Sequence, residues 1–194
     1  MYNMSKRIVK CTIIGDTHVG KSSIIERIIT NNFSNNMETT LGASYFSKSI
    51  NIDNIPTEIQ YWDTAGQERY NSLIPMYLRS ANIILLVFDL SSPYTLQNLT
   101  KWNRMLQICL QNQVTKLIII GNKSDIKNQL DKTSIQEKLS NIEHDYYIEV
   151  SAKTNKNIEK IRTYILLISK HIPHTCKTNL ILSEPEKNKK KCCH

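Results

Sequence analysis

The sequence of 194 residues predicts an α/β protein with a doubly wound, mostly parallel sheet. Short apolar runs that are typical of strands alternate along the chain with segments of helical period. Two of these runs, Ile83–Leu90 and Leu117–Gly121, are apolar almost throughout, as in parallel strands that are covered on both faces. The last helical pattern stops at Pro173. We therefore expect a short extension at residues 1–6, one domain over 7–172 and a flexible tail over 173–194.

The first half of the domain is expected to contain three strands and one helix. The run Ile8–Ile14 predicts the first strand, and Lys21–Thr30 predicts a helix with its isoleucines on one side. Two further strands, Ser44–Ile52 and Glu58–Trp62, are expected to be joined by a turn at Asp53–Pro56.

The second half is expected to alternate strand and helix. Pro93 suits the first turn of a helix, and Ser92 is a candidate cap. The apolar stripe of this helix runs through Leu96, Leu99, Leu106 and Leu110. Asn103 interrupts that stripe once. Tyr146–Val150 predicts a last short strand before the final helix, whose isoleucines repeat at spacings of three and four.

Composition excludes several classes of protein. The longest purely apolar run, Ile83–Phe88, is far shorter than the roughly 20 residues of a spanning helix, and the N-terminus lacks an apolar stretch of signal length. The cysteines are Cys11, Cys109, Cys176, Cys192 and Cys193. Their odd number and the lack of any CxxC pair argue against a disulfide framework and fit a reducing compartment. The net charge of +8 is spread along the chain, apart from a lysine cluster in the tail.

A phosphate-binding loop is predicted at Gly15–Ser22, whose sequence GDTHVGKS fits GxxxxGK[ST] directly after a strand and at the start of a helix. Backbone N–H groups of such a loop converge on polyphosphate oxygens. Lys21 would add a positive charge at the β- and γ-phosphates, and the Ser22 hydroxyl would bind Mg²⁺. A chance glycine-rich turn is the alternative, which these flanking elements disfavour. The candidate binding residues are Gly15, Asp16, Thr17, His18, Val19, Gly20, Lys21, Ser22 and Ser23.

Residues that select the base are predicted at the ends of two later strands. Asp125 can accept two hydrogen bonds from the donor edge of guanine, an edge that adenine lacks. Asn122 can brace the loop and face the base, and the stem of Lys123 can lie over the ring. In Ser151-Ala152-Lys153, the amide of Ala152 can donate to guanine O6. As a lone tetrapeptide, the sequence NKSD would more often be a polar turn.

Two further segments are expected to sense the γ-phosphate. Asp63 follows a strand and can hold Mg²⁺ through water, and Thr40 can add a second hydroxyl to the ion. The amide of Gly66 can approach the γ-phosphate. Gln67 can orient an attacking water, so Gln67 and Lys21 are the candidate catalytic residues.

Together these motifs resemble the small GTPases of the Ras superfamily, and specifically the Rab family. The resemblance covers about residues 6–172, and its most specific stretches are GDTHVGKS, WDTAGQERY, LVFDLS, GNKSD and SAK. The stretches TLGASYF and RYNSLIPMYLRSA are most similar to the early-endosomal branch. The resemblance implies a six-stranded sheet flanked by five helices and slow GTP hydrolysis. It also implies an exchange factor, a GTPase-activating protein, a GDP-dissociation inhibitor, a prenylation escort and effectors that read the GTP form at the switch surface.

By position, Tyr45, Trp62 and Tyr77 match the aromatic residues with which the family recognises effectors. The alternative is that at least one of them belongs to the core, since large aromatic residues are usually buried. Leu78 and Ser80 stand where the family commonly has Tyr and Gly, which leaves the identity of partners open.

The tail ends in KNKKKCCH, and in Rab proteins a C-terminal cysteine pair carries two geranylgeranyl groups. Here Cys192 and Cys193 are followed by one histidine, which departs from the commoner endings. The resemblance implies the cytoplasmic face of intracellular membranes, endosomal by its branch, with a cytosolic pool. A zinc site built from the histidines and cysteines is the alternative, but adjacent cysteines fit zinc spacing poorly. Nucleic acid is not an expected partner, because the lysine run has no interleaved aromatic residues.

We therefore interpret the chain as a Rab-type switch between GTP and GDP that directs vesicle traffic, of the endocytic kind. Its chemistry would be positioning and charge stabilisation by Lys21, Mg²⁺ and Gln67. No arginine can be assigned as a built-in finger, so turnover should be slow. One rival is a binding module that holds nucleotide but hardly hydrolyses it, with His18 as the suspect residue because the family usually has Gly or Ala there. The other is a P-loop kinase, which would leave Asp125 unexplained.

Overall fold

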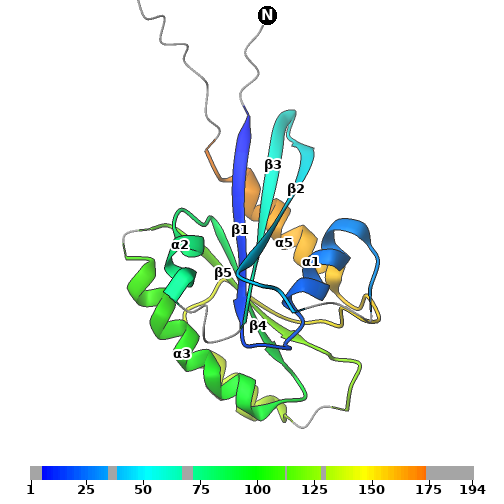
Figure 1. Cartoon of the computed structure of the whole chain (residues 1–194), viewed down its shortest axis with the longest axis vertical. Helices are drawn as coiled ribbons and strands as arrows, with labels where there is room; N and C mark the ends of the chain where they lie inside the picture. Colours follow the sequence, from blue (N-terminus) through cyan, green and yellow to red (C-terminus); the bar gives the residue numbers. More distant parts are fainter. Residues whose placement is uncertain (1–5, 35–38, 67–71, 112, 128–129, 174–194) are drawn as a thin grey trace, which may run out of the picture.

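The computed structural model describes residues 6–34, 39–66, 72–111, 113–127 and 130–173. The described part contains a six-stranded sheet in the order β2-β3-β1-β4-β5-β6, in which only the β2–β3 pair is antiparallel (Figure 1). The strands are β1 Arg7–Gly15, β2 Ala43–Ile52, β3 Ile55–Thr64, β4 Ile83–Asp89, β5 Lys116–Asn122 and β6 Tyr146–Glu149. The predicted doubly wound, mostly parallel sheet is confirmed.

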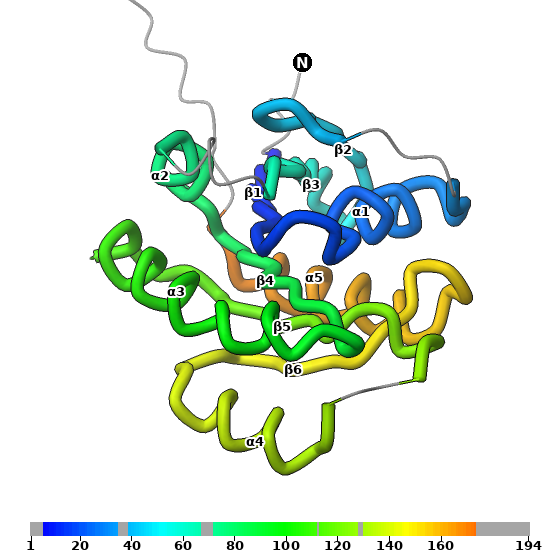
Figure 2. Tube along the Cα trace, turned by 60° about the horizontal axis from the view of Figure 1, so that its bottom comes forward, coloured from blue at the N-terminus to red at the C-terminus, as the bar shows by residue number. Residues whose placement is uncertain are grey.

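Helices cover both faces of this sheet (Figure 2). The described helices are α1 Lys21–Thr30, α2 Ile74–Leu78, α3 Pro93–Cys109, α4 Lys132–Ser140 and α5 Ile158–Lys170. Residues of α1 and α5 share one hydrophobic cluster with the sheet, and residues of α2, α3 and α4 share the other. None of the described helices is both long enough and apolar enough to cross a bilayer.

The two clusters explain why the central strands are apolar except at their ends. Every residue of β4 is buried, and its successive side chains alternate between the two faces. Leu85 and Val87 belong to the cluster with α1 and α5, whereas Leu86 and Phe88 belong to the cluster with α2, α3 and α4. A strand packed in this way has no face left for polar side chains.

The β2–β3 turn is shorter than predicted. Only Asp53 and Asn54 lie outside the strands, and both have positive φ, 51° and 62°. Such a two-residue turn matches the twist of a hairpin and favours Asp and Asn, which tolerate the left-handed region. Pro56 therefore lies in β3, opposite Asn51. The expected turn Asp53–Pro56 was wrong by two residues.

Helix α3 departs from the prediction in its cap and in its buried face. Ser92 is the N-cap residue, but its side chain makes no capping hydrogen bond; instead its carbonyl accepts from the Thr95 hydroxyl at 3.0 Å. Trp102 is buried, and Asn103, which interrupts the predicted stripe, lies only half-buried beside it. The buried face of α3 therefore includes Trp102, the residue before Asn103, in place of Asn103 itself.

Helix α4 was not predicted from periodicity. Only Ile135 and Leu139 of this helix are buried, so its apolar face is two residues wide. Its start is fixed by Asp131, whose side chain accepts a hydrogen bond from the Ser134 amide at 2.7 Å.

Candidate nucleotide-binding site

A cavity of about 410 Å³ opens where β1 and β5 end. This is the position at which open α/β sheets bind their ligands. The predicted site residues that line the cavity are Thr17, His18, Gly20, Lys21, Ser22, Ser23, Thr40, Gly66, Asn122, Lys123, Asp125, Ala152 and Lys153. Segments far apart in the sequence are thus brought together around one space.

The other predicted site residues stand behind this lining or cannot be placed. Gly15, Asp16, Val19, Asp63 and Ser151 contact lining residues without facing the cavity themselves. Gln67, Cys192 and Cys193 lie outside the described residues, so their roles stay predictions.

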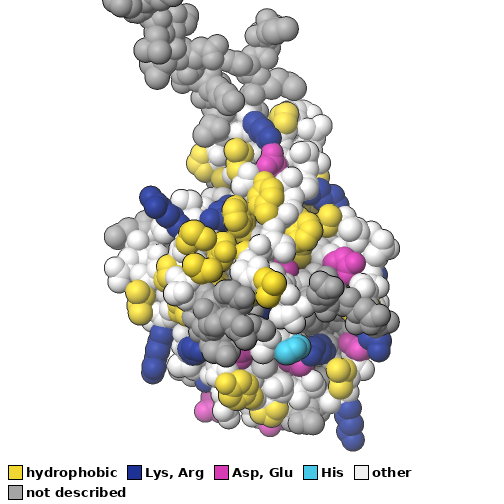
Figure 3. Space-filling model, viewed as in Figure 1, with side chains coloured by type: hydrophobic (Ala, Val, Ile, Leu, Met, Phe, Trp, Pro, Cys, Tyr) yellow, Lys and Arg dark blue, Asp and Glu magenta, His cyan; other side chains and the backbone are white. Residues whose placement is uncertain are grey.

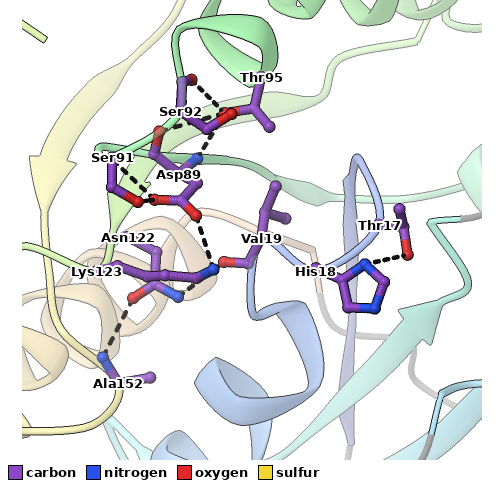
Figure 4. Close-up of polar contacts among 10 residues, drawn as sticks. All are labelled: Thr17, His18, Val19, Asp89, Ser91, Ser92, Thr95, Asn122, Lys123 and Ala152. Carbon is purple, nitrogen blue, oxygen red and sulfur yellow. Dashed lines mark hydrogen bonds and ion pairs between the residues drawn. The ribbon is translucent and has the colours of Figure 1, made fainter. Parts of the chain in front are cut away.

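The phosphate-binding loop joins β1 to α1 through two residues with left-handed backbone. Gly20 has φ 91°, and a Cβ there would lie 2.4 Å from Asn122 Nδ2, so the position requires glycine. His18 has φ 60°, which is unusual for a side chain larger than that of glycine. Its ring is exposed, with Nδ1 3.2 Å from the Thr17 hydroxyl (Figure 4). A histidine thus occupies a backbone conformation that favours glycine.

Lys21 is buried at the centre of the loop. Its ammonium donates to the carbonyls of Gly15 at 3.0 Å and Asp16 at 2.7 Å. Burial lowers the pKa of Lys21 to about 8, against the opposing effect of the Asp63 and Asp16 carboxylates. A Cβ on Gly66 would lie 2.5 Å from the Asp16 carbonyl oxygen and 2.4 Å from Lys21 Nζ, so only glycine lets that segment approach the loop this closely. The Lys21 ammonium thus lies next to the backbone of Gly66.

Three oxygen-bearing side chains converge beside Lys21. The Ser22 hydroxyl lies 3.0 Å from the Thr40 hydroxyl, which lies 3.4 Å from Asp63 Oδ2. Burial raises the pKa of Asp63, although hydrogen bonds from Ser22 and Thr40 and the charge of Lys21 oppose this. Asp63 Oδ1 is buried and has no hydrogen-bond partner among the described residues. A hard divalent cation fits this donor set, because Mg²⁺ prefers oxygen ligands.

The segments that carry Thr40 and Gly66 are joined by backbone contacts. The amide of Ala65 donates to the carbonyl of Gly42 at 2.8 Å. The next residue pair of the ladder is Ala43 with Thr64. The two segments therefore leave the sheet as neighbours.

At the other end of the cavity, Asn122 connects two loops. Its side chain is buried, with Nδ2 donating to Val19 O at 2.8 Å and Oδ1 accepting from the Ala152 amide at 3.2 Å (Figure 4). The predicted bracing role of Asn122 is seen directly. The Ala152 amide, predicted to donate to guanine O6, here donates to Asn122.

The neighbouring charges are also held in place. Lys123 has φ 65°, and its ammonium pairs with Asp89 Oδ2 at 2.7 Å. The Asp89 carboxylate also accepts from the amide and hydroxyl of Ser91. Burial raises the pKa of Asp89, but these partners outweigh it and hold the pKa below its usual value. Asp125 is exposed at the rim, where the Ser151 hydroxyl donates to its Oδ1 at 2.5 Å.

Asp16 turns its side chain away from the cavity. Its carboxylate accepts from Trp102 Nε1 at 2.9 Å and from Asn98 Nδ2 at 2.8 Å, both on α3. Its carbonyl accepts from the Lys21 ammonium, which lines the cavity. The side chain of Asp16 therefore ties the loop to a helix, and a binding role of its backbone stays a prediction.

Some residues that line the cavity were missed from the sequence, and Phe33 is the largest of them. It follows α1, half-buried, with the Arg27 guanidinium 5.7 Å from its ring centroid. The sequence signal that could have indicated this role is that Phe33 is an apolar aromatic residue within the polar stretch NNFSNN.

The aromatic residues predicted to contact effectors form one cluster. Tyr45 packs edge-on against Trp62 at 5.1 Å between centroids, and Trp62 lies 6.0 Å from Tyr77. Tyr45 is exposed but Tyr77 is buried, so one of the three belongs to the core. Hydrophobic side chains gather over α2 and the neighbouring strands (Figure 3), and Met76 of α2 is exposed.

Comparison with known proteins agrees with this geometry. A sequence model described as the Ras family matches residues 10–170. The chain is 36% identical over 153 residues to "Ras-related protein Rab5" of Nicotiana tabacum, covering 78% of this chain and 76% of that protein. It is 32% identical over 206 residues to "Ras-related protein Rab-22A" of Mus musculus, covering 98% and 100%. It is 35% identical over 166 residues to "Ras-related protein YPTC6" of Chlamydomonas reinhardtii, covering 85% and 76%. The chain therefore belongs to the Ras family, as a GTP-binding small GTPase of the Rab type that takes part in vesicle traffic.

Proposed function

We propose that this chain is a Mg²⁺-dependent, slowly hydrolysing GTP/GDP switch of endosomal membranes. The observation that carries the proposal is the convergence of Ser22, Thr40 and Asp63, in which one buried carboxylate oxygen has no partner among the described residues. Lys21 stands beside this group, and Asn122 with Asp125 stands at the far end of the same cavity. Lys21 and the magnesium ligands would thus bind the polyphosphate at one end of the cavity, and Asn122 with Asp125 would bind the base at the other end.

In this proposal, Ser22, Thr40 and Asp63 hold the magnesium ion, which neutralises charge on the β- and γ-phosphate oxygens when bound. Thr40 lies in the segment that enters β2, and Gly66 lies just after β3. Contact of both segments with the γ-phosphate would order them in the GTP form and release them after its loss.

Hydrolysis would depend on positioning. Lys21 offsets negative charge at the phosphates, and Gln67, predicted from the sequence, orients the attacking water. No arginine is assigned to the site, so we propose a slow intrinsic rate and an accelerating GTPase-activating protein. An exchange factor would reverse the switch, and effectors would read the GTP form at the cluster of Tyr45 and Trp62.

The membrane assignment rests on the relatives named Rab5 and Rab-22A and on the tail. We propose an N-terminal extension over residues 1–6, a GTPase domain over 7–172 and a tail over 173–194. Geranylgeranyl groups on Cys192 and Cys193, with the preceding lysines, would hold the protein on a cytoplasmic leaflet. A GDP-dissociation inhibitor and a prenylation escort would maintain the cytosolic pool.

Calorimetry with GDP, GTP and ADP tests the site. We expect guanine nucleotides to bind at least about 10³-fold more tightly than ADP, because only guanine offers two donors to Asp125. Ser22→Ala should remove most of the Mg²⁺ dependence of binding. Thr30→Ala is the matched control, since it removes an exposed hydroxyl from the other end of α1, where it donates to Glu26 O. Equal affinity for ADP, or equal Mg²⁺ dependence in the two variants, would contradict the proposal.

The relatives do not favour the rival of a nucleotide-holding module with weak hydrolysis, which rests on His18 alone. This residue lines the cavity with left-handed backbone. Single-turnover GTP hydrolysis by the wild type and by His18→Gly distinguishes the two. A faster variant would indicate that the imidazole obstructs the γ-phosphate, and equal rates would end this idea.

A further inference from the structure

Arg27, on the last turn of α1, contacts the base end of the cavity from behind. Its Nε donates to Ala152 O at 2.9 Å and its Nη2 donates to Lys153 O at 2.8 Å. Its Nη1 donates to Asn31 O at 2.7 Å. Three nitrogens of one guanidinium therefore reach three carbonyls in two different loops, the one after β6 and the one after α1.

Both sides of Ala152 are fixed by these contacts. Its amide donates to Asn122 Oδ1, and its carbonyl accepts from Arg27. Ala152 itself is buried. Because Ser151 is the preceding residue and its hydroxyl donates to Asp125 Oδ1, the same restraint extends to the carboxylate that is predicted to read guanine.

The guanidinium also contacts a second part of the cavity lining. Its carbon lies 5.7 Å from the centroid of the Phe33 ring, and Phe33 lines the cavity. A cation at this distance attracts the face of an aromatic ring. One side chain thus contacts both the loop of residues 151–153 and the ring of Phe33.

We propose that Arg27 is a positioning residue that sets how slowly, and how selectively for guanine, this site releases its nucleotide. The inference rests on the proposed nucleotide site. Arg27 does not line the cavity, so it would act through Ala152, Lys153 and Phe33 and not by touching the base.

Arginine is required because of its shape. The planar fork carries five N–H donors in fixed directions, whereas lysine has one ammonium on a flexible stem. Lysine at position 27 would keep the charge but could not reach Ala152 O, Lys153 O and Asn31 O together.

Arg162 on α5 supplies a matched control. Its guanidinium donates to Ile28 O at 3.1 Å and to Arg27 O at 2.7 Å, and it pairs with Glu159. Its Nη2 also lies 3.4 Å from Asn31 Oδ1, so Arg162 caps the end of α1 on a neighbouring side. Within the described part of the chain it makes no hydrogen bond to residues 151–153. A loss of general stability should affect both arginine variants, and a loss of base positioning should affect only Arg27.

The test measures release of fluorescent GDP, IDP and ADP from the full chain, with Mg²⁺ in excess, for the wild type, R27Q, R27K and R162Q. IDP lacks the 2-amino group of guanine, so the ratio of IDP to GDP release rates reports the reading by Asp125. We expect R27Q to release GDP about 10-fold or more faster, because charge-assisted hydrogen bonds to the loop are lost. The IDP-to-GDP ratio should shrink, R27K should fall between R27Q and the wild type, and R162Q should change GDP release less than about 2-fold.

The results separate this inference from the site it rests on. If the wild type releases ADP as slowly as GDP, the guanine site itself is wrong and both proposals fall. If the wild type selects GDP but R27Q matches R162Q, or R27Q speeds GDP and IDP by the same factor, only the positioning role is overturned. Should R27Q fail to fold, R27K against R162Q decides by the same two criteria.

Discussion

Replacing Asp16 by alanine should loosen the phosphate-binding loop from helix α3. In the folded protein, the carboxylate accepts one hydrogen bond from Trp102 Nε1 and one from Asn98 Nδ2. The variant removes both acceptors and leaves the indole N–H of a buried tryptophan without its partner. The loop would keep its backbone contacts to Lys21 but lose its side-chain tie to the second layer of the fold.

The expected cost follows from these two bonds. Hydrogen bonds to a charged acceptor each contribute about 1.5–3 kcal/mol, and Asp16 is only half-buried, so the lower figure applies to each. Asp16→Ala should therefore lower the free energy of unfolding by about 3 kcal/mol. Asp16→Asn keeps one acceptor oxygen and should lower it by about half as much.

Urea unfolding followed by far-ultraviolet circular dichroism measures this, with the same excess of GDP and Mg²⁺ for every variant because bound ligand raises apparent stability. The set is completed by Trp102→Phe and by the double variant. The coupling free energy of the Asp16–Trp102 cycle should reach about 1 kcal/mol or more, as for residues in direct contact. A coupling below about 0.3 kcal/mol would refute the tie between loop and helix.

Three further predictions concern backbone strain, charge and close approach. Ser80 has φ 59°, so Ser80→Gly should raise stability by about 0.5–1 kcal/mol, the difference between left-handed strain and glycine entropy, and thermal unfolding with no rise in Tm would contradict this. Asp89→Asn should be less stable than the wild type at neutral pH. In pH-dependent unfolding this gap should close as the pH falls below the ordinary Asp value of 3.8 and through the lowered pKa of Asp89, because the wild-type carboxyl is then neutral too; a constant gap would contradict it. Gly66→Ala should displace Lys21 and weaken GTP binding by about 10-fold or more while the preference for guanine over adenine stays intact, and calorimetry showing unchanged GTP affinity would contradict it.

The parts of the site that could be predicted from sequence are those whose chemistry lies in consecutive residues. The loop Gly15–Ser22 and the pair Asn122 and Asp125 each carry donor and acceptor groups on a short segment that directly follows a buried strand. The strands themselves could be predicted because burial on both faces excludes polar side chains, as in Ile83–Phe88. Local pattern and global position agree in these segments.

The contacts that were missed join residues far apart in the chain. Arg27 and Lys153 are separated by 126 positions, and Asp16 and Trp102 by 86, so no local spacing indicates either pair. Asp16 is a predicted binding residue because its backbone belongs to the loop motif, and no local pattern indicates that its side chain contacts α3 instead. Helix α4 was missed for a different reason, since an apolar face of two residues gives almost no periodic signal.

The hydrogen bond between the Ala65 amide and the Gly42 carbonyl, with the ladder pair beside it, has a thermodynamic consequence. Neither segment can move far at its root without stretching the other, so their free energies of rearrangement are not independent. The affinity of a partner that binds one segment should therefore depend on the conformation of both. The two segments should therefore rearrange together, so that their surface has two states and not a series of intermediate ones.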